Sequence, residues 1–504
     1  MGPKYQELAA RLADLHNLNM AYWLLQWDQN VYMPPSGADA RAAQMATLQS
    51  LRHQILTDDK TARLIEAAAL EIDPDDFDST PTSLVRIARQ DYASAMQLPT
   101  AFVEESAQAV AAGFSAWHEA KSTNNYRHFL PALQRIFDLK MRETELRGYT
   151  DHPYDVMLEN WERGLTTKQV SAIFADLEPA LIELTAAVSA SQDKVDDALL
   201  HQRFPIPQQR ELAQYVSTAF GVDYTRWARL DEAPHPFSLQ ISTQDIRLTT
   251  RFDENFFNPA FFGTLHETGH SLHGHGFAPE IEGTFLSDME LGSQAVCEAQ
   301  SRLWENMIGR SQAFWSWVFP KAKELFPAQF GRAKADTLYR AVNKVHPQFI
   351  RVEADELTYN LHILLRFEIE LDLVEGKLRL ADAPEAWNAK FKEYFGIVPP
   401  TDSVGILQDI HWSMGGFGMF VGYAIGNIAA AQYYNRALAA HPEIPAEIGQ
   451  GKFATLRAWL TENIYRHGRK YTLDEMTQRA TGSDLQSRDY IAYLRQKFGA
   501  LYGI

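Results

Sequence analysis

Residues 258–276, which read NPAFFGTLHETGHSLHGHG, combine apolar side chains at helical spacing with a spaced pair of histidines. Positions four apart on a helix lie on one face, about 5–6 Å apart, so His266 and His270 could both reach one metal ion. Zinc accepts neutral imidazole nitrogens at about 2.0–2.1 Å in a tetrahedral site. Glu267 directly follows the first histidine and could take a proton from a water molecule at such an ion. Because Pro259 suits the first turn of a helix, the stretch predicts a helix that carries a metal site.

A site of this kind needs a third ligand from another part of the chain. A third histidine at the position used by the longer HExxH motifs is excluded, since Gly276 stands there. An acidic residue on a following helix is the alternative. Glu290, Glu298 and Glu305 all lie in such a segment, and their spacing does not distinguish among them. A chance pair among the 16 histidines would not explain the apolar residues around the motif.

The composition is that of an ordinary globular protein. The 504 residues are 46% hydrophobic, and the formal net charge is −17. An acidic surface repels phosphate, so a nucleic-acid partner is not expected. Cys297 is the only cysteine, which excludes an internal disulfide and a cysteine-based zinc site and fits a reducing compartment, the cytoplasm. No signal sequence is visible, and the longest nearly apolar stretch, 419–431, is too short to span a bilayer, so no membrane association is expected.

Apolar residues recur at helical spacing along most of the chain. One region, 237–252, instead has β-branched and alternating apolar residues, with a turn expected at 242–245. No repeat or Pro/Gly/Ser-rich linker is present, so a single domain over 1–504, divided into two lobes, is expected. The predicted fold is mainly α, with a small sheet just before the motif helix. Helices are predicted over 5–27, 38–56, 83–121, 126–148, 167–192, 207–219, 259–274, 290–308, 351–375 and 453–466.

Seven ordered stretches resemble the motifs of one known family. They are WDQ at 27–29, YMPPSG at 32–37 followed by Arg41, DIRLT at 245–249, HETGH at 266–270, EAQSR at 298–302, IRVEAD at 350–355 and GILQDIHW at 405–412. With these motifs the chain resembles the carboxypeptidase Taq family of metallocarboxypeptidases over nearly its whole length. The resemblance implies a two-lobed, helical, gluzincin-type fold with the metal at the floor of a long central cleft. It also implies His266, His270 and Glu298 as the metal ligands, which selects Glu298 over the other two acids.

The resemblance implies an activity as well. Members of the family trim amino acids from peptide C-termini with broad specificity, accept terminal proline poorly, and commonly form homodimers. The expected cofactor is Zn²⁺, with Co²⁺ or Mn²⁺ as possible substitutes at the same ligands. Glu267 is expected to act as the general base on zinc-activated water. The rival interpretations are an oligopeptidase or dipeptidyl carboxypeptidase on a similar helical cleft, and a zinc protein without catalytic activity.

Further site residues are expected in or near the later motifs. His411 and Tyr423 are the candidates for stabilising an oxyanion, with a core histidine and a packed aromatic as the plain alternatives. Arg351 is expected to bind the free C-terminal carboxylate through two parallel hydrogen bonds, and Arg247 is the second candidate. The two acids of the IRVEAD motif are expected to share a helix with Arg351 and to pair with it. Gln408 is expected to line the substrate cleft.

The sequence departs from the usual family motifs at three positions. Cys297 and Ala299 stand where histidine and serine are usual, and Met419 stands where tyrosine is usual. At position 297 a hydrogen bond to a metal ligand is expected to be lost. Cys297 is expected to be a buried and unreactive thiol, and the alternative is an additional metal ligand.

Overall fold

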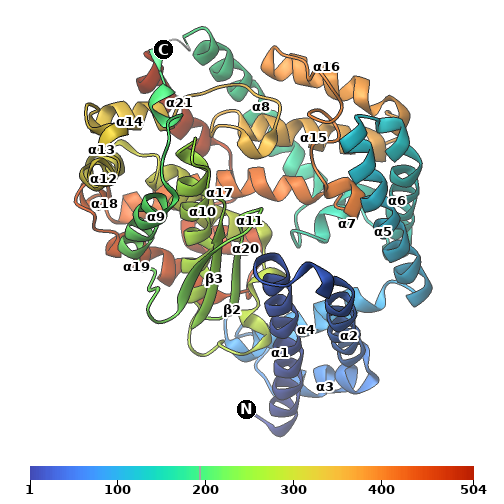
Figure 1. Cartoon of the computed structure of the whole chain (residues 1–504). Helices are drawn as coiled ribbons and strands as arrows, with labels where there is room; N and C mark the ends of the chain where they lie inside the picture. Colours follow the sequence, from blue (N-terminus) through green and yellow to red (C-terminus); the bar gives the residue numbers. More distant parts are fainter. Residues whose placement is uncertain (192–193) are drawn as a thin grey trace. The chain divides into compact units, whose positions relative to one another are not determined.

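The computed structural model describes residues 1–191 and 194–504 (Figure 1). In this part of the chain helices predominate, and the strands form one three-stranded sheet. The prediction of a mainly α fold with a small sheet before the motif helix is therefore confirmed. None of the helices in the described ranges combines the length and apolar character that crossing a bilayer requires.

The chain forms two compact units, each assembled from three separate segments. The first unit comprises Met1–Met96, Asp197–Val342 and Tyr433–Ser483, and the second comprises Gln97–Asp196, Asn343–Gln432 and Asp484–Ile504. A single catalytic domain with two lobes around a central cleft stays a prediction.

The first unit contains the sheet and the motif helix. Its strands are β1 (Ala228–Glu232), β2 (Ser238–Ser242) and β3 (Asp245–Thr250). Its α-helices are α1 (Pro3–Val31), α2 (Ala38–Thr57), α3 (Asp59–Ala69), α4 (Thr80–Met96), α9 (Ile206–Phe220), α10 (Asn258–His275), α11 (Gln294–Arg302), α12 (Gln312–Leu325), α13 (Pro327–Phe330), α14 (Ala335–Val342), α18 (Ile444–Ile448), α19 (Ala454–Asn463) and α20 (Leu473–Thr481).

The second unit contains helices and irregular segments but no strand in its described residues. Its α-helices are α5 (Thr100–Thr123), α6 (Tyr126–Arg147), α7 (Pro153–Glu159), α8 (Thr167–Ser189), α15 (Tyr359–Val374), α16 (Ala383–Phe395) and α21 (Arg488–Tyr502). Helix α17 (Met419–Ala440) begins in the second unit and ends in the first.

The sheet provides the base on which the motif helix lies. β2 and β3 form the predicted antiparallel hairpin, while β1 pairs in parallel with β3, giving the strand order β1-β3-β2. Helix α10 packs against β2 and β3 (Figure 1). Leu248 of β3 pairs with Ser238 of β2, and Oγ of Ser238 lies 3.0 Å from Oγ of Ser271 in α10. Oγ1 of Thr250 donates a 3.2 Å hydrogen bond to the backbone oxygen of Ala260, at the start of α10. The sheet therefore holds α10 through these polar contacts and through the same strand face that carries buried Leu248, a side chain whose burial contributes about 1.5–3 kcal/mol to folding.

Two predicted helices have different boundaries for identifiable reasons. The stretch 83–121 forms two helices, α4 and α5, because Pro99 cannot continue the first helix and stands at the N-cap of the second. The predicted helix 290–308 begins only with α11, after its N-cap Ser293, and then continues as the π-helix η6 (Leu303–Ile308). Short π-helical segments are rare and often mark functional sites.

The prediction for 351–375 is wrong in its first part. Residues Arg351–Glu353 form a 3₁₀ turn, η7, and α15 begins only at Tyr359. The side chain of Asp355 accepts hydrogen bonds from the backbone N–H groups of Leu357 and Thr358, which holds this stretch in a turn. The predicted end of another helix at residue 192 lies outside the described residues.

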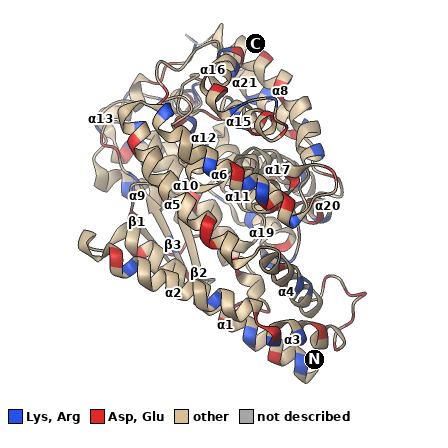
Figure 2. Cartoon of the chain, turned by 90° about the vertical axis from the view of Figure 1, so that its right-hand side faces the viewer, with Lys and Arg blue, Asp and Glu red and all other residues tan. Residues whose placement is uncertain are grey.

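Acidic and basic residues occur along the same helices, as the colours of Figure 2 show for α3. This helix, DKTARLIEAAA, carries two residues of each sign. The formal net charge of −17 therefore reflects an excess of acidic over basic residues, and residues of both signs share helices such as α3.

Candidate metal centre

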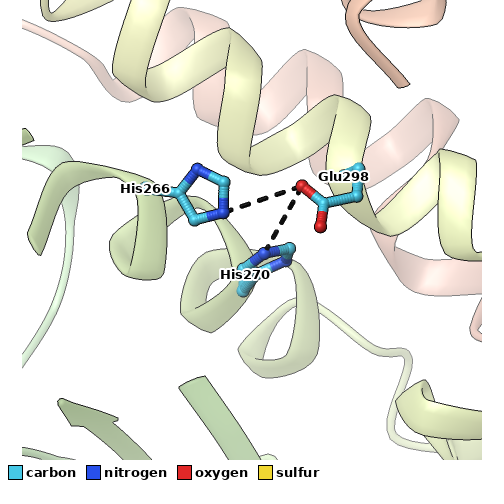
Figure 3. A group of neighbouring side chains, drawn as sticks. All are labelled: His266, His270 and Glu298. Atoms are coloured by element: carbon cyan, nitrogen blue, oxygen red, sulfur yellow. Dashed lines mark ion pairs between the residues drawn. The ribbon is translucent and has the colours of Figure 1, made fainter. Parts of the chain in front are cut away.

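Two helices of the first unit bring three potential metal ligands together (Figure 3). α10 presents His266 and His270 with their ring centroids 5.0 Å apart. Glu298 projects from α11, and its Oε2 lies 3.6 Å from Nε2 of His266 and 4.0 Å from Nε2 of His270. The three ligand atoms all lie within 4.8 Å of one another. Ligands held 2.0–2.1 Å from a tetrahedral zinc ion lie about 3.3 Å apart, so a small contraction would close this group around one ion.

The close approach of the two helices depends on Gly269, which lies between the two histidines. A Cβ atom at this position would lie 2.5 Å from the backbone oxygen of Gln300 and 2.5 Å from Cα of Ser301. Any side chain there would push α11 away from α10. The glycine therefore allows Glu298 to face the histidine pair.

Glu290 and Glu305, the other two candidates for the third ligand, do not face both histidines. Glu305, in η6, approaches His266 from its other ring nitrogen, with Oε2 2.9 Å from Nδ1. Glu290 is exposed, in the 3₁₀ turn η5 (Met289–Leu291). Glu298 is thus the acid that faces both Nε2 atoms.

Glu305 is held as a carboxylate by its neighbours. Burial alone would raise the pKa of its carboxyl group, but Arg302, the hydrogen bond with His266, and Arg310 outweigh burial and hold the pKa at about 2. Nη1 of Arg302 lies 3.2 Å from the same oxygen that faces His266. A charged carboxylate accepts the Nδ1 proton of His266, which leaves Nε2 available to a cation.

Cys297 occupies the corresponding position beside His270. Its Sγ lies 3.1 Å from Nδ1 of His270, so the expected loss of a hydrogen bond at position 297 is wrong. The thiol is only half-buried, and its sulfur lies outside the group of three ligand atoms. Burial lowers the pKa of His270 to about 4, so this ring is neutral at pH 7 and can bind a cation.

Glu267 lies beside the ligand group and is 5% exposed. Its pKa is raised to about 8 chiefly by burial, with His266 opposing the rise and Glu298 and Glu305 adding to it. A divalent cation held by the neighbouring ligands would favour the charged carboxylate and lower this pKa.

The residues present fit a divalent cation. Two imidazoles and one carboxylate form a ligand set that is usual for catalytic zinc. Oγ of Ser301 donates a hydrogen bond of 2.9 Å to Oε2 of Glu298, which orients that carboxylate. Each of the three potential ligands is therefore contacted by a further side chain, as ligands of bound metals usually are.

The second unit contains a buried ionic cluster around Arg351. Nη2 of Arg351 lies 2.8 Å from Oδ1 of Asp409, and its Nε lies 3.2 Å from both carboxylate oxygens. Arg366 approaches the same carboxylate at 2.6 Å. Two guanidinium groups therefore share one carboxylate, which gives the cluster a formal charge of +1. Burial raises the pKa of Asp409, but the two arginines outweigh it and hold this pKa far below the ordinary value.

The expected partners of Arg351 are thus wrong. Its ionic partner is Asp409, whereas Asp355 caps the following turn and Glu353 is exposed. Oε1 of Gln408 accepts a 2.7 Å hydrogen bond from the backbone N–H of Arg351. Its expected place along the substrate cleft stays a prediction.

His411 and Tyr423 lie near this cluster in the second unit. The ring of His411 packs against Phe420 with centroids 4.3 Å apart and lies edge-on to Tyr423 at 6.2 Å. The guanidinium carbon of Arg351 is 5.3 Å from the centroid of the Tyr423 ring. The structure therefore brings Arg351, Gln408, His411 and Tyr423 together, within one unit.

Glu370 of α15 anchors the segment that carries His411. Its buried carboxyl group accepts hydrogen bonds from Trp412 Nε1 at 2.6 Å, from Tyr154 Oη at 2.6 Å and from the backbone N–H of Gly418 at 2.8 Å. Burial raises its pKa to about 7, although these three donors lower it.

Arg247 lies in the first unit, on β3. Its guanidinium pairs with Asp245, with Nη2 and Oδ2 3.0 Å apart, and stacks 4.3 Å from the centroid of Trp27. Its charge is therefore already balanced within the DIRLT motif.

The sequence from residue 7 to residue 498 matches the carboxypeptidase Taq (M32) metallopeptidase family. The chain belongs to this family. Carboxypeptidase 1 of Bacillus subtilis is 37% identical to this M32 chain over 491 residues, 97% of each sequence. Thermostable carboxypeptidase 1 of Thermus thermophilus is 38% identical over 489 residues, 95% of each.

A solved M32 structure agrees with the fold. The crystal structure of the M32 carboxypeptidase from Deinococcus radiodurans superposes with a TM-score of 0.96 at 37% identity, and the match covers 100% of both chains. The resemblance found in the sequence is therefore confirmed, and the protein is a metallopeptidase hydrolase.

Two residues that contact the candidate histidine ligands have roles that the sequence does not predict. The sequence predicts Glu305 only as a possible ligand, and it predicts no contact between Cys297 and a histidine. A signal for Glu305 does exist, because it follows Glu298 by seven residues, which is two helical turns and places both acids on one side of the segment. Nothing in the sequence indicates the contact of Cys297 with His270.

Proposed function

We propose that this protein is a zinc-dependent carboxypeptidase that removes single residues from the C-termini of peptides. His266, His270 and Glu298 would hold the ion, and Glu267 would be the general base. The observation that carries the proposal is the convergence of the three ligand atoms within 4.8 Å, with Glu267 next to the first histidine. Co²⁺ or Mn²⁺ could occupy the same ligands.

The chemistry divides between the ion and the chain. When bound, zinc supplies a Lewis acid that polarises the scissile carbonyl and makes a nearby water molecule more acidic. The carboxylate of Glu267 accepts a proton from the attacking water and passes it to the leaving amine. Its burial excludes bulk solvent, so the proton stays between the water, Glu267 and the amine.

The ionic cluster of the second unit suits the recognition of a free carboxylate. Arg351 and Arg366 exceed Asp409 by one positive charge, and a guanidinium binds a carboxylate through two parallel hydrogen bonds. We assign carboxylate recognition to Arg351, with Gln408 fixing its backbone. Arg247 is the weaker candidate, since Asp245 balances its charge alone, whereas Asp409 is shared between Arg351 and Arg366.

His411 and Tyr423 are proposed as hydrogen-bond donors to the oxyanion of the tetrahedral intermediate. Such a donor contributes about 2.7–4 kcal/mol to transition-state stabilisation. Broad specificity with poor acceptance of terminal proline, assembly as a homodimer and a cytoplasmic location complete the proposal, and they rest on the family alone.

Product analysis tests this function. N-terminally blocked peptides are incubated with zinc-loaded protein and followed by mass spectrometry, and successive loss of single C-terminal residues is expected. Release of dipeptides or internal fragments would favour the rival peptidases, and full zinc occupancy without hydrolysis would favour a non-catalytic zinc protein.

A matched variant tests the role of Glu267. Glu267→Gln should retain zinc, because the ligands are unchanged, and should lose about 10²–10⁴-fold in turnover with the general base. Wild-type turnover in this variant would remove Glu267 from the mechanism.

A further inference from the structure

His266 and His270 differ in the atom that faces their second ring nitrogen. Nδ1 of His266 lies 2.9 Å from a carboxylate oxygen of Glu305, whereas Nδ1 of His270 lies 3.1 Å from Sγ of Cys297. Both rings turn Nε2 toward Glu298, at 3.6 and 4.0 Å. A neutral imidazole that offers Nε2 to a cation carries its proton on Nδ1, so the group facing Nδ1 has to accept a hydrogen bond.

A carboxylate and a thiol differ in how strongly they accept a hydrogen bond from Nδ1–H. Hydrogen bonds to an ionised acceptor are about twice as strong as those between neutral groups, and thiol sulfur is a weak acceptor. Glu305 is itself fixed by Arg302, at 3.2 Å. Cys297 is fixed through its backbone, because its N–H group donates a 3.1 Å hydrogen bond to the oxygen of Ser293 at the start of α11.

We propose that Cys297 is a positioning residue for His270, and that its sulfur accepts the Nδ1–H hydrogen bond which determines how tightly the centre retains its cation. The inference rests on the proposed function, since it requires His270 to be a metal ligand. The sulfur is not a further ligand, because it faces the ring nitrogen that does not point to Glu298 and lies outside the ligand group. As the weaker acceptor, it leaves His270 the less firmly oriented of the two histidines.

Three variants of the full-length protein separate this role from simple packing. Cys297→Ala removes the acceptor, and Cys297→Asn replaces it with an amide oxygen. Val296→Ala is the control, because it truncates the neighbouring side chain on the same helix. The side chain of Val296 is buried, with only 4% exposed. The measurements are the zinc Kd of metal-stripped protein by competition with a chromophoric chelator, the visible absorption bands of Co²⁺-loaded protein, and the unfolding temperature of the metal-free protein.

Cys297→Ala should weaken zinc binding about 10–100-fold, the usual effect of losing a partner of a metal ligand, and should shift the Co²⁺ bands. The unfolding temperature of its metal-free form should stay that of the wild type. Cys297→Asn should bind zinc at least as tightly as the wild type. Val296→Ala should lower the unfolding temperature and leave the zinc Kd unchanged.

Equal zinc affinity in the wild type and in Cys297→Ala would overturn the inference, and so would a Cys297→Asn variant that binds as weakly as Cys297→Ala. Either result would leave the proposed function standing, because His266→Ala would still abolish zinc binding. A wild-type protein that takes up no zinc would instead overturn the proposed function, and the role of Cys297 with it.

Discussion

Replacing Gly269 with alanine would place a methyl group against the backbone of α11. The new Cβ would lie 2.5 Å from the oxygen of Gln300 and from Cα of Ser301, whereas ordinary contact begins at 3.4 Å. The difference, 3.4 − 2.5 = 0.9 Å, has to come from separation of the two helices, since both opposing atoms belong to the backbone.

The substitution has two opposing effects on the free energy of unfolding. Overpacking of this kind lowers it by about 1–3 kcal/mol, and the better helix propensity of alanine restores about 1 kcal/mol. Glu298 lies two residues before Gln300 and moves with α11, away from both histidines. Because a misplacement of about 1 Å near reacting groups costs about 10²-fold in rate, we expect a loss of this size in peptidase activity, with weaker zinc binding.

Gly263→Ala is the matched control on the same helix. Its Cβ would lie 3.5 Å from Cγ of Pro236 and 3.7 Å from Oγ1 of Thr250, which are ordinary contacts. The assays are the unfolding temperature, the zinc Kd and the rate of release of the C-terminal residue. Gly263→Ala should match or exceed wild-type stability and retain activity. If Gly269→Ala behaves like this control in all three assays, the spacing of the two helices does not depend on that glycine.

Three further perturbations follow from the buried charges. Glu305→Gln removes the charged acceptor at Nδ1 of His266 and should weaken zinc binding about 10–100-fold by chelator competition; an unchanged Kd would contradict this role. Asp409→Asn leaves two buried arginines, including Arg351, without a counter-charge and should cost about 3–5 kcal/mol, seen as a marked fall in unfolding temperature; an unaltered melting curve would refute the argument. The pKa of Glu370 is raised from 4.5 to about 7, so the folded state binds the proton of this carboxyl group more tightly than the unfolded state does. The contribution of Glu370 to the free energy of unfolding is therefore largest below pH 4.5 and is lost as the pH rises to 7. That rise in pKa corresponds to about 3 kcal/mol, so wild-type stability should decline more steeply than that of Glu370→Gln over this range, and parallel curves would exclude the assignment.

The features that the sequence predicted are those that depend on local spacing. The HETGH helix needs only positions four apart and a proline at its start, and the β2–β3 hairpin needs only neighbouring residues. Glu298 could not be chosen from spacing, because the approach of α11 to α10 depends on a glycine whose neighbours, Gln300 and Ser301, follow it by about thirty positions.

Long-range pairing explains the remaining errors. The parallel pairing of β1 with β3 joins segments on either side of β2, and no local pattern indicates it. The acid paired with Arg351 is Asp409, 58 residues away, whereas the nearer acids, Glu353 and Asp355, were expected to pair with it. The wrong helix over 351–358 follows from the same limit, since the turn-stabilising hydrogen bonds of Asp355 compete with helix formation there.

The interleaving of segments between the two units bears on how the protein is made. The ribosome releases the first 96 residues of the first unit long before Tyr433–Ser483, which complete that unit, and most of the second unit emerges in between. Neither unit can finish folding as an independent N-terminal piece during translation. A ribosome stalled near residue 430 would therefore hold a chain in which both units are incomplete. Expression of either unit alone would require its three segments to be joined by new linkers.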